Sequence, residues 1–119
     1  FTSGEALAAL YRGARAIVVP SEWFENCPMV VLEAYAHGKP VVGSNLGGLV
    51  DLIEDGRTGS LVAAGDVAAW TRALQDVADA PQRWHEMGAV ARERAEERYA
   101  PGPHLDALER LFADAISTR

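Results

Sequence analysis

Two glutamates lie eight positions apart in the segment ENCPMVVLE, which reads as a turn running into an apolar helix. Glu25 falls in the polar turn, where water can solvate a carboxylate. Glu33 falls in the helix, between Leu32 and Ala34, and apolar residues occupy nearly every side of that helix. An ionised carboxylate left unpaired in an apolar interior costs several kcal/mol. We therefore expect Glu33 to be buried and to have a partner: an internal cation, a set of hydrogen-bond donors, or a ligand.

The residue types alone leave a purely structural interpretation of Glu33 open. Arg15 and Lys39 are nearby in sequence and could form a salt bridge with it, since structural ion pairs are common. Alternatively, the side chain could reach solvent at the ends of the strands. Neither alternative assigns Glu33 a role in ligand binding.

Short apolar runs alternate with helical segments along the first half of the chain. Residues 16–20, 40–44 and 60–62 read as buried strands, and residues 28–37 and 49–53 as helices between them. This alternation predicts an α/β fold with a parallel, Rossmann-like sheet of about three strands and helices on both faces. The second half reads as helices separated by Pro81 and by the Pro101–Pro103 segment. We thus divide the chain into an α/β part, residues 1–62, and a helical tail, residues 66–119.

The position of the predicted 28–37 helix favours a ligand. The loop before it leaves the carboxyl end of a parallel strand, which is where open α/β sheets bind ligands. Free N–H groups and the positive end of the helix dipole make the helix N-terminus a phosphate site. Glu33 lies about 7.5 Å further along the axis, from five residues of rise. A nucleoside diphosphate spans this gap, with its pyrophosphate at the N-terminus and its ribose hydroxyls donating to Glu33.

A longer set of motifs surrounds the two glutamates. Pro20-Ser21-Glu22 precedes them, and Gly38-Lys39-Pro40-Val41-Val42 follows the helix. Gly47-Gly48 and then Glu54-Asp55-Gly56-x-Thr58-Gly59 continue the pattern. Together these residues resemble the donor-binding domain of the retaining group 1, or family 4, glycosyltransferases of the GT-B fold. The chain differs from many members at Pro28-Met29, where Gly-Leu is common, and at Asp51, where Glu is common.

This resemblance implies a function and a site. Chain 1–119 would be part of the C-terminal half of a GT-B enzyme that moves a sugar from a nucleotide-diphosphate-sugar to an acceptor hydroxyl with retention of configuration. Glu25 would lie beside the transferred sugar as the catalytic residue, and Glu33 would bind the ribose. Residues 27–30, namely Cys27, Pro28, Met29 and Val30, would contribute to donor binding, the diphosphate being held by backbone N–H groups near Cys27, Met29 and Val30. The loop at Gly47 and Gly48 would frame the cleft.

The resemblance also implies what lies outside the chain. Family members use an Arg and a Lys from the earlier half of the donor domain, and an N-terminal domain for the acceptor, which could be a sugar, a lipid or a small molecule. We therefore expect the 119-residue chain alone to be inactive, and its exposed sheet edge to be a candidate homodimer interface. Two alternatives are a noncatalytic nucleotide-binding or assembly module and a GT-B-like sugar-nucleotide epimerase. The presence of both Glu25 and Glu33 argues against the first alternative.

Bulk properties exclude several other classes of protein. The net charge of −6 argues against nucleic-acid binding, and no apolar run is long enough for a membrane span. The single cysteine, Cys27, cannot form an internal disulfide, and no spacing of cysteine and histidine suggests a zinc site. We expect a cytoplasmic protein, attached to the inner membrane at most peripherally through the acceptor domain, with no metal and no cofactor besides the donor substrate.

The remaining aromatic residues and histidines are expected to be structural. Trp70, Trp84 and Phe112 have the spacing of core residues on helices, and the pair Trp23-Phe24 is interpreted as core packing, with sugar or acceptor contact as the less favoured alternative. Cys27 is expected to be a small packing residue or a backbone donor. His37, His85 and His104 are expected to be solvated.

Overall fold

Three short parallel strands form the sheet of this computed structural model, which describes residues 1–118. Strands β1 (Ile17–Val19), β2 (Val41–Ser44) and β3 (Gly59–Val62) lie in the order β1-β2-β3. Val18 pairs with Val42, which in turn pairs with Ser60. The predicted α/β fold with three parallel strands is confirmed. The expectation that all three strands are buried holds for β2, whereas β3 is half-buried at its centre and Val18 of the edge strand β1 is 42% exposed.

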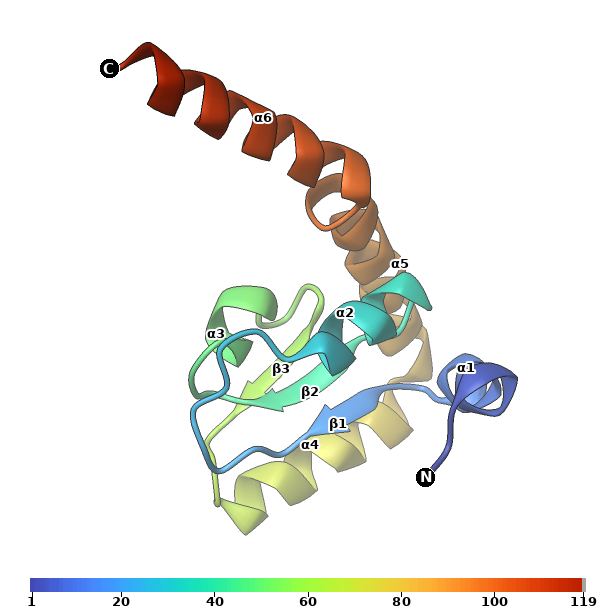
Figure 1. Ribbon diagram of the computed structural model, residues 1–119. Coiled ribbons are helices and arrows are strands. Elements are labelled where there is room, and N and C mark those ends of the chain that lie inside the picture. Colours follow the sequence, from blue (N-terminus) through green and yellow to red (C-terminus); the bar gives the residue numbers. More distant parts are fainter. Residues whose placement is uncertain (119) are drawn as a thin grey trace.

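Residues 1–118 also form six helices, of which α2, α3 and α4 cover the two faces of the sheet (Figure 1). Helix α4 packs under the sheet, whereas α2 and α3 lie on the opposite face. Each strand is followed by a helix, so every strand-to-helix loop lies at the carboxyl edge of the sheet. The bounds are α1 Gly4–Gly13, α2 Met29–Ala36, α3 Leu49–Leu52, α4 Val67–Asp79, α5 Pro81–Arg98 and α6 Pro101–Ser117.

Helix α5 links the two hydrophobic cores. Its residues Trp84 and Met87 are buried with Val42 of β2 in the core beneath the sheet. One turn later, Ala91 belongs to the other core, beside Val31 of α2. Helix α5 therefore passes the amino edge of the sheet, and a substitution at the crossing point affects both cores.

A buried tyrosine fixes α2 against the loop before β3. The hydroxyl of Tyr35 donates to the Leu52 carbonyl at 3.1 Å and lies 2.6 Å from the Thr58 hydroxyl. The Thr58 oxygen in turn accepts from the Glu54 N–H at 2.9 Å. Desolvation by burial, opposed by the Thr58 hydrogen bond, raises the pKa of Tyr35 to about 12. Tyr35 therefore keeps its proton, as a buried donor must.

Helix α6 projects away from the rest of the chain and contacts only its neighbour α5 closely (Figure 1). Its apolar stripe is exposed, and Phe112 is 58% accessible. The prediction that Phe112 lies in a core is wrong for residues 1–118, because no described element covers that face; the matching prediction for Trp84 is correct. Within residues 1–118 no helix combines the length and the apolar character needed to cross a membrane.

Close backbone contact at the α5 crossing generates a first prediction. A Cβ added at Gly88 would lie 2.2 Å from the Gly38 carbonyl oxygen, so α2 and α5 would have to separate. Gly88→Ala should lower the free energy of unfolding by about 1–3 kcal/mol, although alanine is the better helix former. Chemical denaturation measures the change.

The matched control is Gly13→Ala, at the end of α1, where an added Cβ meets nothing within 4 Å. This variant should be neutral or more stable by up to about 1 kcal/mol. Equal effects of the two substitutions would contradict the packing argument.

An ion-pair cluster around Glu54 generates a second prediction. The Arg94 guanidinium donates to Glu54 at 2.6 Å, and this hydrogen bond is the main reason why the pKa of Glu54 lies below its usual value. A lowered carboxyl pKa stabilises the fold above the unfolded-state pKa, about 4.3, and the contribution is lost as pH falls through the folded-state value. Arg94→Gln should therefore destabilise the protein more at pH 7 than at pH 3, measured by thermal unfolding at both values.

The control for this pair is Arg92→Gln, which removes an exposed ion pair with Glu96 on the same helix. Exposed pairs contribute little, so its effect should be small at both pH values. An Arg94→Gln effect that does not change with pH would refute the proposed role of Glu54.

Candidate functional site

The candidate site lies at the carboxyl edge of the sheet, where the loop 20–28 leaves β1 and the loop 45–48 leaves β2. These loops bring together Glu25, Gly47 and Gly48, all of which were singled out from the sequence. The Gly48 N–H donates to the Glu25 carbonyl at 2.6 Å. The two loops therefore form one unit in front of α2.

The two glycines are required by this contact. A Cβ at Gly48 would lie 1.8 Å from the Asn26 carbonyl oxygen, and one at Gly47 would lie 2.9 Å from that of Glu25. Gly47 also has φ +57°, in the left-handed region that favours glycine. Only residues without side chains allow the loops to approach this closely.

The Glu25 side chain is half-buried and held by its own loop. The buried Ser21 hydroxyl donates to Glu25 Oε1 at 2.8 Å. One carboxylate oxygen of Glu25 accepts from Ser21, and its backbone carbonyl accepts from the Gly48 N–H. These two hydrogen bonds hold the residue in place. Its second oxygen has no partner within residues 1–118 that the structure shows as a hydrogen bond.

The N-terminus of α2 has no side-chain cap. Pro28, which the sequence predicts as the first helical residue, is instead the N-cap residue, the helix begins at Met29, and Pro28 makes no side-chain capping hydrogen bond. The first N–H groups of a helix have no acceptor within the helix, which here concerns Met29 and Val30. Met29 is 61% exposed, Val30 is partly buried, and Cys27 beside them is an exposed free thiol, so its interpretation as a packing residue is wrong.

The expectation that Glu33 is buried is wrong. Helix α2 buries Val31, Ala34 and Tyr35 completely, whereas Met29 and Glu33 lie on its exposed side. The sheet and α5 cover the side of the helix that carries the buried residues, and the side that carries Met29 and Glu33 faces solvent. Neither Arg15 nor Lys39 pairs with Glu33 among the ion pairs of residues 1–118. The desolvation argument for a ligand at Glu33 therefore fails.

The observed partner of Glu33 is Tyr11, whose hydroxyl donates to Glu33 Oε2 at 2.9 Å. Tyr11 belongs to α1 and is 6% exposed. Sequence analysis missed this contact, because the two residues are 22 positions apart and no local pattern joins them. In the sequence, Tyr11 is distinguished only by its place in the helical spacing of apolar residues in α1, which indicates burial but names no partner.

Trp23 and Phe24 are exposed, at 65% and 81%, in the same loop as Glu25. Their interpretation as core residues is wrong. No described element covers this loop on its outer side, and two aromatic side chains thus stand at the rim of the candidate site.

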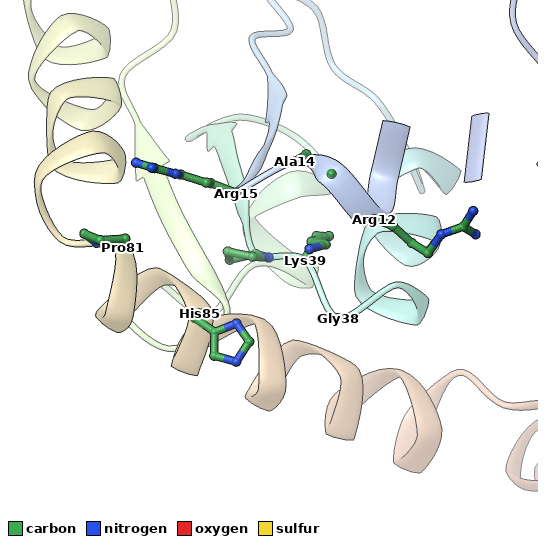
Figure 2. A pocket seen from close by; sticks show the side chains of 9 residues that line it. Arg12, Ala14, Arg15, Gly38, Lys39, Pro81 and His85 are labelled. Atoms are coloured by element: carbon green, nitrogen blue, oxygen red, sulfur yellow. The ribbon is translucent and has the colours of Figure 1, made fainter. Parts of the chain in front are cut away.

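The opposite edge of the sheet holds a different hollow, a cavity of about 260 Å³ lined by basic residues (Figure 2). Arg12 and Arg15 point in different directions there: Arg12 pairs with Glu5, and Arg15 donates to the Ala78 carbonyl at 3.3 Å. Lys39 and His85 complete its polar lining. Only Arg12 is paired with a carboxylate there, because the partner of Arg15 is a neutral carbonyl. The cavity lies at the amino edge of the sheet and Glu25 at the carboxyl edge, so the two do not form one site.

Residues 1–118 contain no group of three or more His, Cys, Asp and Glu side chains placed to hold a metal ion. The candidate site itself presents two carboxylates, a helix N-terminus and exposed aromatic rings.

Known proteins resemble this chain in sequence over most of its length. The D-inositol 3-phosphate glycosyltransferase of Streptomyces scabiei is 45% identical over 92 residues, which are 77% of this chain and 20% of the relative. That of Gordonia bronchialis is 42% identical over 112 residues, 94% of this chain and 24% of the relative. The chain thus spans about a fifth to a quarter of the length of these relatives.

Solved structures share the fold. A sucrose-phosphate synthase from Thermosynechococcus elongatus superposes with a TM-score of 0.86 at 30% identity, covering 97% of this chain and 29% of that one. The Anabaena HepE protein in complex with UDP-glucose gives a TM-score of 0.76 at 23% identity, covering 92% and 29%. These structures are GT-B glycosyltransferases, and the match corresponds to a part of their C-terminal domain.

The family model described as "Glycosyl transferases group 1" matches residues 1–80, which hold the sheet, both glutamates and the glycine pair. This chain belongs to the group 1 glycosyltransferases.

Proposed function

We propose that this chain is the donor-binding part of a retaining, family 4 glycosyltransferase. The full-length protein transfers a sugar from a nucleotide-diphosphate-sugar to an acceptor hydroxyl, with retention of anomeric configuration and without a metal. The observation that carries the proposal is the joined pair of loops, which holds Glu25 in the segment that leads into the N-terminus of α2, where no side chain caps the helix.

Diphosphate binding follows from the start of α2. Unpaired N–H groups and the positive helix end bind anions, and they stabilise the charge that develops on the departing diphosphate. Pro28 has no N–H, so Met29, Val30 and Cys27 supply the donors. This anion site lacks a basic side chain within the loop 20–28, and cations from outside residues 1–119 complete it in the proposed enzyme.

In this proposal Glu25, whose carboxylate accepts from Ser21, lies beside the transferred sugar. Its second oxygen can accept from sugar hydroxyls and keep the anomeric carbon in line for attack. Glu33, about a turn into α2, can accept from the ribose hydroxyls on the exposed side of the helix. Trp23 and Phe24 are available to contact the sugar or acceptor.

The similar proteins suggest which substrates to test first. The Anabaena structures contain UDP and UDP-glucose, so UDP-glucose is the first donor to test. The sequence relatives are D-inositol 3-phosphate glycosyltransferases, so that polyol phosphate is the first acceptor to test. In this proposal the acceptor binds chiefly outside residues 1–119, with Trp23 and Phe24 as the contacts available to it within the chain.

Glu33→Gln tests the ribose assignment. Loss of hydrogen bonds to a charged acceptor should weaken donor binding by about 10- to 100-fold, since such bonds contribute roughly 1.5–3 kcal/mol. Calorimetric titration of the full-length protein with UDP-, GDP- and ADP-glucose measures the change.

Nucleotides without a ribose 2′-hydroxyl provide the control. The difference in affinity between Glu33→Gln and the unmodified protein should be smaller for 2′-deoxy-UDP than for UDP. An unchanged affinity of Glu33→Gln for every donor would remove the ribose assignment.

Glu25→Gln tests the assignment of Glu25 to the reacting centre. A poorly oriented sugar should lower kcat about a hundredfold, while donor affinity changes less than tenfold. Steady-state kinetics with UDP-glucose and D-inositol 3-phosphate measure both quantities. Glu22→Gln, an exposed glutamate of the same loop, is the matched control and should retain its activity; an equal loss in both variants would count against a specific role of Glu25.

A further inference from the structure

We propose that Tyr11 is a positioning residue for Glu33: by donating to one carboxylate oxygen, it holds the other ready for the donor's ribose. This inference rests on the proposed function, because it gives Tyr11 a role only if Glu33 meets a ribose. It adds α1, an element remote from the loops of the site, to the donor-binding machinery.

The geometry distinguishes the two oxygens of Glu33. Oε2 accepts from the Tyr11 hydroxyl at 2.9 Å, and the structure shows no partner for Oε1 within residues 1–118. Glu33 is exposed, and an exposed glutamate that lacks a partner samples several rotamers. A single directional hydrogen bond reduces that freedom before the ligand arrives, which lowers the entropic cost of binding.

Tyr11 can act as a fixed donor because its ring is held on two sides. The ring is 6% exposed in the core that also contains Val31 and Tyr35. It also stacks on His37, with ring centroids 4.8 Å apart and 12° between the planes. His37 is tied to the same helix through Nδ1, which lies 2.8 Å from the Glu33 carbonyl oxygen.

The protonation state of Tyr11 supports the same arrangement. Burial and the neighbouring carboxylate raise the pKa of Tyr11 to about 12. The Tyr11 hydroxyl therefore keeps its proton well above neutral pH and can donate to Glu33 there.

A purely structural role for Tyr11 makes different predictions. A buried hydroxyl that serves packing alone contributes to folding stability and leaves the donor KM unchanged. Tyr35 provides the comparison within the same core, because its hydroxyl bonds Leu52 and Thr58 instead of Glu33. Phenylalanine substitution at each position removes one hydroxyl and keeps the ring.

The experiment compares Tyr11→Phe, Tyr35→Phe, Glu33→Ala and the double variant Tyr11→Phe/Glu33→Ala in the full-length protein. The donor is UDP-glucose, or whichever of the UDP-, GDP- and ADP-glucose probes binds most tightly. Donor KM, kcat and thermal stability are measured for each variant. Tyr11→Phe should raise the donor KM about three- to tenfold with kcat nearly unchanged, the pattern expected when ground-state binding is lost.

The double variant shows whether Tyr11 acts through Glu33. Adding Tyr11→Phe to Glu33→Ala should raise the KM no further, because interacting residues are non-additive. Tyr35→Phe should lower thermal stability and leave the donor KM within twofold. The loss of affinity caused by Tyr11→Phe should also be smaller for 2′-deoxy-UDP than for UDP.

The outcomes separate the two hypotheses. If Glu33→Ala raises the donor KM and Tyr11→Phe does not, the positioning role is refuted and the proposed function stands. If the Tyr11→Phe effect persists in full in the Glu33→Ala background, Tyr11 acts by another route and the inference also fails. If Glu33→Ala itself leaves the donor KM unchanged, the ribose assignment fails and the inference falls with it.

Discussion

The candidate site depends on one backbone contact, between Gly48 and the segment Glu25–Asn26. At this point two loops from neighbouring strands touch with no room for a Cβ, and the Gly48 N–H bonds the Glu25 carbonyl at 2.6 Å. Parallel strands place their following loops at the same edge, but they do not by themselves bring those loops into contact. The glycine pair does so, and it thereby fixes the backbone at Glu25 and Asn26, in the loop that leads into α2.

The two glutamates are held by different parts of the fold. Glu25 depends on its own loop, through Ser21, and on the loop after β2. Glu33 depends on α2 for its place and on Tyr11 of α1 for its orientation. A nucleoside diphosphate bound between them would contact one continuous segment, residues 25–33, which the loop after β2 and helix α1 support. Its affinity would then depend on how α1 and α2 are held together, and the common core of Val31, Tyr35 and Tyr11 does this.

The sequence predicts the strands well, because β-branched runs such as Ile17–Val19 carry a local signal. It predicts the exposure of Glu33 poorly, since α2 is apolar on nearly every side and has no clear periodicity that would show which side faces solvent. That side is decided by α5 and the sheet, which are distant in sequence. The wrong predictions for Trp23, Phe24 and Phe112 have the same cause. An aromatic side chain suggests burial, but it is buried only if another element of the fold covers it. The contact of Tyr11 with Glu33 joins two helices and has no local signature.

Exposure changes what Glu33 can contribute to binding. A buried, unpaired carboxylate would be strained without a ligand, and binding would relieve that strain. An exposed one is already hydrated, so a ribose hydroxyl replaces water at its oxygens and the net gain is modest. The gain is larger for a ligand whose two hydroxyls match a carboxylate that is already oriented, because less freedom is lost on binding. A solvent-facing glutamate held by one tyrosine is thus suited to distinguishing ribose from deoxyribose, more than to supplying the bulk of the affinity. The diphosphate at the start of α2 can supply that bulk through charge.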